Sequence, residues 1–174
     1  MSTEQSIGQL TQLLQQQFPK AIEGFHDHRG DETILVDRKE ILAICQFLKD
    51  DERCKMEMMI DLTAVDYINE TPRFEVVYHF KSLSLDHRLR LKARVPEDDC
   101  HIDSIHALWM AVDWYERECY DMYGITFTHH PNLKRLLMYD EFEGYPLRKD
   151  YPVDKQQPRL ELREVHERYD YERS

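Results

Sequence analysis

The segments RFEVVYHF, residues 73–80, and RLRLKARV, residues 88–95, alternate apolar and polar side chains with a period of two. This spacing is typical of β-strands that bury one face and leave the other in water. The segment MEMMIDLTA, residues 56–64, continues the same pattern on the N-terminal side, and the connections between the three segments are short. We therefore predict three consecutive strands that pair as an antiparallel meander.

The residues before this meander predict two amphipathic helices and a pair of short strands. Ser2 and Gln5 can form a capping box for a first helix that ends near Pro19. Polar and glycine-containing turn residues separate the next two apolar segments, and helical spacing of apolar residues then returns. The expected elements are strands at residues 22–25 and 33–36, and a second helix at residues 41–48.

A third helix is expected from Asp103 or Ser104 to Gly124, because glycine is well suited to end a helix in the left-handed conformation. The predicted fold is therefore a two-layer α+β domain over residues 1–124. Its order is helix, two strands, helix, three-stranded meander and helix. One helical layer would cover one face of the sheet.

Residues 125–174, here called the arm, show no sustained period apart from a possible short helix at residues 160–169. Four prolines interrupt this region, yet it carries many large apolar side chains. A segment this apolar is not expected to stay in water, and one this irregular is uncommon inside a compact domain. We therefore expect the arm to lie on another protein.

Composition excludes several classes of function. The net charge of -11 disfavours nucleic acid and anionic lipid as partners. No apolar stretch reaches the roughly 20 residues of a membrane span, and the N-terminus lacks the features of a signal peptide, which favours the cytoplasm. Neither a phosphate-binding glycine loop nor a cysteine spacing typical of iron–sulfur or zinc sites occurs, so the four cysteines are expected to be reduced thiols.

The triplet Glu116-Arg117-Glu118 stands inside an otherwise apolar helix. At 100° per residue Glu116 falls within the apolar arc, so its carboxylate needs a proton, an arginine or hydrogen-bond donors. Arg135 or Arg148 of the arm, or an arginine of a partner, could provide this match. Glu118 points to the opposite side, where aromatic and charged residues mix as they do at protein interfaces.

Two chemical alternatives remain open, an acid–base pair in the triplet and a metal site at histidines, and the basic row of the meander has two interpretations. Glu116 and Glu118 would be a poor acid–base pair, because residues two apart point to opposite sides of a helix. A metal site at His129-His130 or His26-x-His28 would need further ligands. The basic row Arg88, Arg90, Lys92 and Arg94 is either a solvated strand face beside acids such as Glu75 or a docking patch for an acidic partner.

The stretches ERECYDMYGITFTHHPNLKRLL, residues 116–137, and PLRKDYP, residues 146–152, resemble the signature of the thirty-kilodalton (C-type) subunit of bacterial respiratory complex I, the NADH:quinone oxidoreductase. DLTAVDY and the two strands quoted first are also similar to that family. The residues that match the pattern, and that the resemblance implies for partner binding, are Glu116, Arg117, Glu118, Asp121, Gly124, Phe127, His130, Pro131, Leu133, Arg135, Pro146, Leu147, Arg148, Lys149, Asp150 and Pro152.

The sequence departs from the family at two places. The glycine that often follows the last proline is missing from YPVDKQQP, and the glycine common before His130 is replaced. His129 stands where glycine is common, so a side chain is expected to adopt a backbone conformation with positive φ at some cost.

The resemblance implies a subunit without a redox centre, in the peripheral arm on the cytoplasmic side of the inner membrane. Its partners would be the quinone-site (D-type) subunit and neighbouring iron–sulfur subunits. FMN, iron–sulfur clusters and quinone would be held by other subunits of the proton-translocating enzyme. Related scaffold subunits occur in membrane-bound hydrogenases and formate hydrogenlyase. An independent soluble acid–base enzyme using Glu116 and His130 is the alternative from another class.

Overall fold

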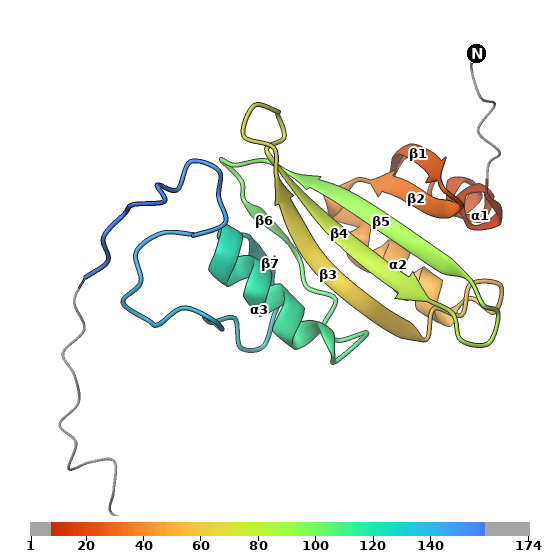
Figure 1. Cartoon of the computed structure of the whole chain (residues 1–174). Coiled ribbons are helices and arrows are strands. Elements are labelled where there is room, and N and C mark those ends of the chain that lie inside the picture. Colours follow the sequence, from red (N-terminus) through yellow and green to blue (C-terminus); the bar gives the residue numbers. More distant parts are fainter. Residues whose placement is uncertain (1–7, 159–174) are drawn as a thin grey trace, which may run out of the picture.

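A five-stranded mixed sheet forms the centre of the computed structural model, which describes residues 8–158 (Figure 1). The last three strands pair antiparallel as the predicted meander. The N-terminal hairpin joins this meander by parallel pairing of its second strand with the last strand, which the sequence did not predict. In spatial order the strands are β1 (Ile22–His28), β2 (Asp31–Val36), β5 (Arg88–Val95), β4 (Phe74–Lys81) and β3 (Met58–Asp66).

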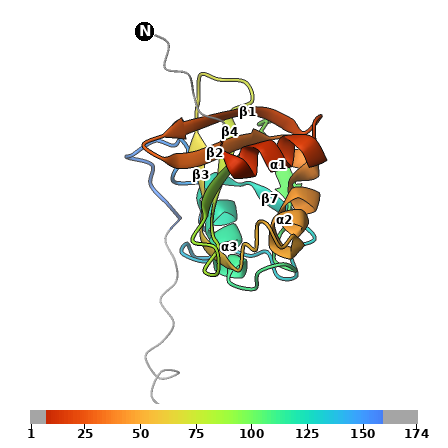
Figure 2. The same cartoon turned by 90° about the vertical axis from the view of Figure 1, so that its right-hand side faces the viewer.

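One face of this sheet is covered by helices, as the two-layer prediction requires. The helices α1 (Gln9–Gln17) and α2 (Ile41–Asp50) lie on the same side of the sheet, and the short helix η1 (Arg38–Glu40) leads into α2 (Figure 2). The expected capping box at Ser2 and Gln5 and the expected helix at residues 160–169 lie outside the described residues.

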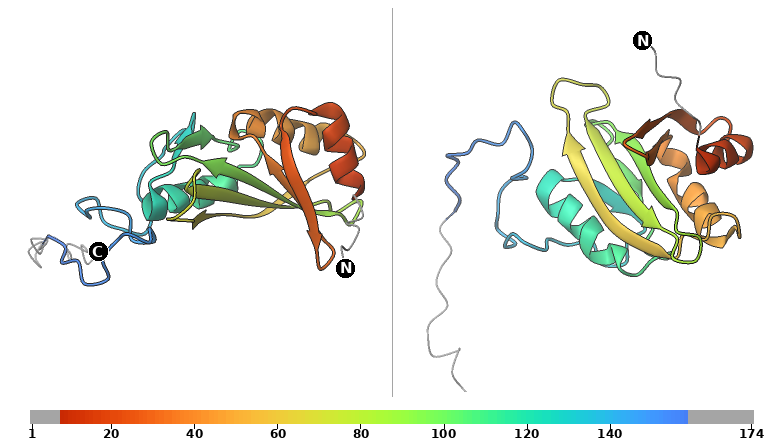
Figure 3. Two further views of the ribbon diagram at one scale, coloured as in Figure 1. Left: turned by 90° about the horizontal axis from the view of Figure 1, so that it is seen from above. Right: turned by 45° about the vertical axis from the view of Figure 1, so that its right-hand side comes forward.

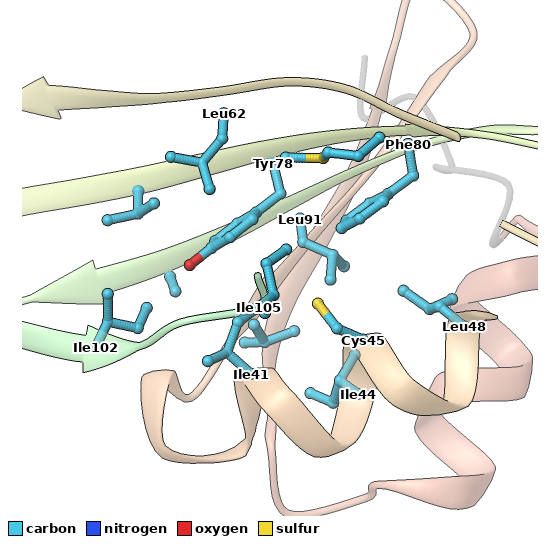
Figure 4. Packing of buried hydrophobic residues seen from close by; sticks show 14 of the residues in the cluster. Ile41, Ile44, Cys45, Leu48, Leu62, Tyr78, Phe80, Leu91, Ile102 and Ile105 are labelled. Atoms are coloured by element: carbon cyan, nitrogen blue, oxygen red, sulfur yellow. The ribbon is translucent and has the colours of Figure 1, made fainter. Parts of the chain in front are cut away.

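The hydrophobic core lies between the sheet and α2. Tyr78, Phe80 and Leu91 point from β4 and β5 towards Ile44 and Leu48 of α2 (Figure 4). All five are essentially inaccessible to solvent, and burying such a side chain contributes about 1.5–3 kcal/mol. The alternation seen in the sequence therefore marks the inner face of the sheet correctly.

The predicted start of the third helix at Asp103 or Ser104 is wrong, because α3 (Val112–Tyr123) begins later. Asp103 ends a short strand, β6 (His101–Asp103), which pairs in parallel with β7 (Thr126–Thr128). Residues 104–111 form turns instead of a helix. The Ser104 hydroxyl and the Ile105 N–H both donate to the Glu116 side chain, which holds this segment against the side of α3.

The helix α3 runs along β3 at the edge of the sheet. The Tyr115 hydroxyl donates to the Ile60 carbonyl at a distance of 3.2 Å, and Cys119 Sγ lies 4.0 Å from the Leu62 carbonyl. Gly124 ends α3 with a φ of 75°, as predicted from its position in the sequence. This edge of the sheet is therefore covered and cannot pair with another strand.

The other face of the sheet carries the basic row on β5. Lys92 and Arg94 lie 2.9 Å and 3.5 Å from the carboxylate of Glu75, and Arg90 lies 3.4 Å from Asp31. These pairs within the chain count against a docking patch for these three residues, although the expected acid, Glu75, is only 3% exposed and the face is therefore not fully solvated. They leave Arg88 as the basic side chain of the row without an ion pair in the described part of the chain.

After β7 the arm takes an irregular course beside α3 (Figure 3). Ile125 and Phe127 are still buried, whereas none of residues 129–158 belongs to the buried set of the fold. No helix among residues 8–158 combines the length and the apolar character that a membrane span requires.

Candidate partner-docking site

The carboxylate of Asp121 fastens the arm to α3. One of its oxygens accepts the N–H groups of Leu136, Leu137 and Met138 at 3.0, 2.7 and 2.8 Å, and the other accepts Arg135 Nη1 at 2.7 Å. Burial alone would raise the pKa of Asp121, but these donors hold it below its usual value. A fully buried carboxylate with four donors is stably ionised, and it fixes residues 135–138 of the arm.

Two arginines satisfy the carbonyl groups of the irregular segment. Arg117 donates to the carbonyls of Lys134 and Arg135, both at a distance of 3.2 Å. Its guanidinium lies over the Trp114 ring. Arg135 donates to the carbonyls of Phe142 and Gly144. The E-R-E helix and the H-P-x-L-x-R turn of the resemblance are therefore in direct contact, with the arginine of each serving the backbone of the arm.

A second contact brings the PLRKD segment back to the end of α3. Arg148 Nε donates to the Tyr123 carbonyl at 2.6 Å, and the Leu147 N–H donates to the Met122 carbonyl at 3.1 Å. The Tyr145 ring covers Gly124, where an added Cβ would lie only 2.5 Å from the ring. Glycine is thus required at position 124 both by its positive φ and by this approach.

A third contact joins the arm to the sheet. Arg73, which is 6% exposed, donates from two nitrogens to both carboxylate oxygens of Asp66, each at 2.8 Å, and also binds Asp150 at 2.8 Å. The Lys149 N–H donates to the Asp66 carboxylate at a distance of 2.7 Å. Hydrogen bonds from Arg73 lower the pKa of both carboxyl groups. Asp66 and Arg73 were not among the predicted site residues, although a charge on the inner side of a strand alternation is a signal for such a pair.

Glu116 is held by hydrogen-bond donors and not by the predicted arginines. It is 0% exposed and accepts the Ser104 hydroxyl at 2.6 Å and the Ile105 N–H at 2.8 Å. Arg135 and Arg148 are engaged elsewhere, so the expectation that either would match Glu116 is wrong. Burial raises the pKa of Glu116 to about 7 in spite of the two donors.

His130 is the nearest titratable neighbour of Glu116. Its Nε2 lies 3.9 Å from Glu116 and 3.3 Å from Asp113, while its Nδ1 accepts the Asn132 N–H. Burial lowers the pKa of His130, so the ring is neutral near pH 7 and carries its proton on Nε2. Both side chains, which the enzyme alternative would use as an acid–base pair, are closed to solvent.

The same region presents apolar side chains to solvent. Trp114 on α3 is 59% exposed beside the exposed Glu118, and the arm adds Leu137 at 58%, Leu147 at 48% and Val153 at 106%. Exposed patches that mix an aromatic ring, aliphatic side chains and charges are typical of protein interfaces.

The other residues of the signature have structural or peripheral positions. Phe127 is buried in β7, and Leu133 packs partly against the core. His129 adopts a φ of 66°, which confirms the expectation of a positive φ at this departure from the family. Among residues 8–158, no three His, Cys, Asp or Glu side chains are grouped so that they could hold a metal ion. The prolines of the signature lie along the arm and are exposed or partly exposed: Pro131, Pro146 and Pro152.

Comparisons with known proteins identify the family of this chain. The profile of the family described as "Respiratory-chain NADH dehydrogenase, 30 Kd subunit" matches residues 34–157. A relative from Citrifermentans bemidjiense, named as the C-type subunit of NADH-quinone oxidoreductase, is 48% identical over 140 residues, which are 80% of this chain and 86% of the relative. A protein of the same name from Hyphomonas neptunium is 42% identical over 149 residues, covering 86% and 73% of the two chains.

Two solved structures share the fold. The trypsin-resistant fragment of Nqo5 aligns with a TM-score of 0.61 at 25% identity, over 71% of this chain and 98% of the fragment. A chain of the membrane-bound sulfane sulfur reductase, an archaeal respiratory membrane complex, aligns with a TM-score of 0.70 at 23% identity, over 83% of this chain and 84% of its own. Since the family profile spans most of the described residues and the relatives match along most of their length, this chain belongs to the family of the 30 kDa subunit of the respiratory-chain NADH dehydrogenase.

Proposed function

We propose that this chain is a scaffold subunit without a redox centre in the peripheral arm of a proton-translocating NADH:quinone oxidoreductase, on the cytoplasmic side of the inner membrane. In this proposal α3 and the arm hold the quinone-site (D-type) subunit and neighbouring iron–sulfur subunits. FMN, iron–sulfur clusters and quinone would be bound by those other subunits. The chain would support turnover by keeping them in fixed positions, because small displacements slow electron transfer and quinone chemistry.

One observation carries this proposal. The polar backbone groups at the start of the arm are satisfied by Asp121, Arg117 and Arg135, whereas Leu137 and Leu147 beside them remain exposed. A segment fixed in place with its apolar side chains uncovered is best explained by a partner that covers them. The names of the relatives favour NADH:quinone oxidoreductase over the hydrogenase-type alternative.

A pair of substitutions tests the docking role. In the double variant Leu137→Asp with Leu147→Asp, we expect the amount of assembled enzyme on native gels of membranes to fall about tenfold or more, because burying a charge at an interface is costly. Both positions are exposed, so the chain itself should remain folded. Leu42→Asp on α2, at 37% exposure, is the matched control and should leave assembly unchanged.

Normal assembly of the double variant would contradict the docking role. Turnover of NADH with a quinone by the purified single chain would contradict the absence of a redox centre and favour an independent enzyme.

A further inference from the structure

Four exposed aliphatic side chains gather at the end of the sheet where the β4–β5 turn lies. Met58 and Ile60 on β3 are 47% and 38% exposed, and Leu83 and Leu85 in the turn are 64% and 41% exposed. With the neighbouring Arg88 they form what we call the turn-end surface. Figure 1 shows this turn at the opposite end of the sheet from the arm. Single exposed aliphatic residues are ordinary, but a group of four on neighbouring segments indicates an interaction site.

The turn that presents two of these side chains is held in one conformation. The Glu57 carboxylate accepts the N–H groups of Leu83 and Ser84 at 2.6 and 3.2 Å, and it also accepts the hydroxyls of Ser82 and Ser84. Because the turn is already ordered, binding a partner there would lose little conformational entropy.

The charges beside the aliphatic group define what could cover it. A shallow hollow runs from Ile60 to Arg88 and Arg90, and Asp31 and Glu32 also line it. Arg90 is paired with Asp31, and Glu32 accepts hydrogen bonds from the start of α1. Arg88 is exposed and forms no ion pair within 4 Å among residues 8–158. The hollow therefore offers one exposed cation without an ion pair next to an aliphatic surface.

We propose that the turn-end surface docks a second protein of the same assembly, through a segment in which a carboxylate side chain stands between aliphatic side chains. The carboxylate would meet Arg88, and the aliphatic side chains would cover Leu83 and Met58. A second copy of this chain is a poor occupant, because each copy carries a net charge of -11 and two copies would repel each other. The turn-end surface is separate from the arm. This inference rests on the proposed function only in that the chain is part of a complex of several proteins.

Photo-crosslinking in the intact complex tests this surface. A p-benzoyl-phenylalanine at position 83, in membranes that hold the assembled enzyme, should give a product with another polypeptide, and mass spectrometry of the product should show a segment containing Asp or Glu. The same probe at position 42 is the control for an exposed leucine elsewhere, and we expect no product there. The probe at position 137 reports separately on the arm.

Charge reversal identifies the role of the cation. Arg88→Glu should reduce the crosslink from position 83 about tenfold, the effect expected when like charges are brought into contact at an interface. Replacing the identified partner carboxylate by lysine should restore it.

The possible outcomes separate the two proposals. A product from position 137 without one from position 83 would overturn the turn-end surface and leave the proposed function standing. A product that contains only two copies of this chain, or one that is unaffected by Arg88→Glu, would also overturn the docking mode. A product from position 83 without one from position 137 would count against the docking of the arm instead.

Discussion

The substitution Asp121→Asn should release the start of the arm from α3 while leaving the sheet folded. The carboxylate of Asp121 is fully buried and accepts four hydrogen bonds, three from N–H groups of residues 136–138 and one from Arg135. An asparagine keeps one acceptor oxygen but replaces the other with an NH₂ group. That group would face N–H donors or the Arg135 guanidinium, so at least one of the four bonds cannot form and a donor would meet a donor.

The size of the effect follows from these contacts. A hydrogen bond to a charged group contributes about 1.5–3 kcal/mol, and removing one partner of a buried ion pair costs about 3–5 kcal/mol. Since the amide oxygen can still accept part of the set, we expect about 3 kcal/mol for the free energy of detaching this segment. That corresponds to a change of roughly 100-fold in its opening equilibrium.

Amide hydrogen exchange of the full-length chain measures this equilibrium directly. The N–H groups of Leu136, Leu137 and Met138 should exchange roughly 100-fold faster in Asp121→Asn, whereas amides of β4 should keep their protection. Glu118→Gln removes the same charge from an exposed position on the same helix and should change exchange by no more than roughly twofold. Equal exchange at residues 136–138 in the two variants would refute the role assigned to Asp121.

Three further changes address other contacts of the site. Because the pKa of Glu116 is raised from 4.5 to about 7, its contribution to stability is full below pH 4.5 and is lost as pH rises to 7. Urea unfolding should therefore show a loss of up to about 3 kcal/mol over this window that Glu116→Gln removes, and identical pH profiles would contradict the buried carboxyl. His129→Gly should raise the free energy of unfolding by about 0.5–1 kcal/mol, since glycine accepts a φ of 66° without strain, and a loss of stability would count against this. Arg73→Lys cannot bind Asp66 through two nitrogens and Asp150 at once, so limited proteolysis near residue 149 should accelerate about tenfold while an unchanged cleavage rate would contradict this contact.

The sequence predicted the meander and its buried face because alternation is a property of each strand alone. Phe74, Tyr78 and Leu91 are buried as their positions in the pattern require. The parallel pairing of β2 with β5 could not be read in the same way, since it joins Thr33 to Arg90 across 57 residues. Nothing in either segment alone distinguishes this neighbour from other possible strand partners.

The start of α3 was misplaced for a related reason. The apolar residues between Ser104 and Val112 suit a helix, and no proline or glycine interrupts them. In the structure the carboxylate of Glu116 binds the Ser104 hydroxyl and the Ile105 N–H and holds this segment against α3, and turns follow in place of a continuous helix. A contact with a side chain 11 residues away leaves no local signal in the segment itself.

Sequence reasoning identified the buried charges of the site but not all of their partners. The arc of the helix correctly placed Glu116 in the core. Of the matches left open for its carboxylate, which were a proton, an arginine or hydrogen-bond donors, the structure has the donors. Arg135 instead meets Asp121, a signature residue for which the sequence analysis predicted no buried position. The difference between these positions depends on where the arm crosses α3, and only the three-dimensional path of the arm decides that.

The chemistry of these contacts explains why an irregular arm can have a defined path. Outside helices and strands each backbone N–H and C=O needs another partner, and ordering each residue costs about 1–2 kcal/mol of backbone entropy. Asp121 accepts the N–H groups of one stretch, while Arg117 and Arg135 donate to carbonyls on either side of it. These long side chains come from α3 and from the arm itself, so the path is set without any regular structure. The exposed Leu137 therefore already occupies a fixed position, and a partner that covers it gains the burial of apolar surface with little further ordering.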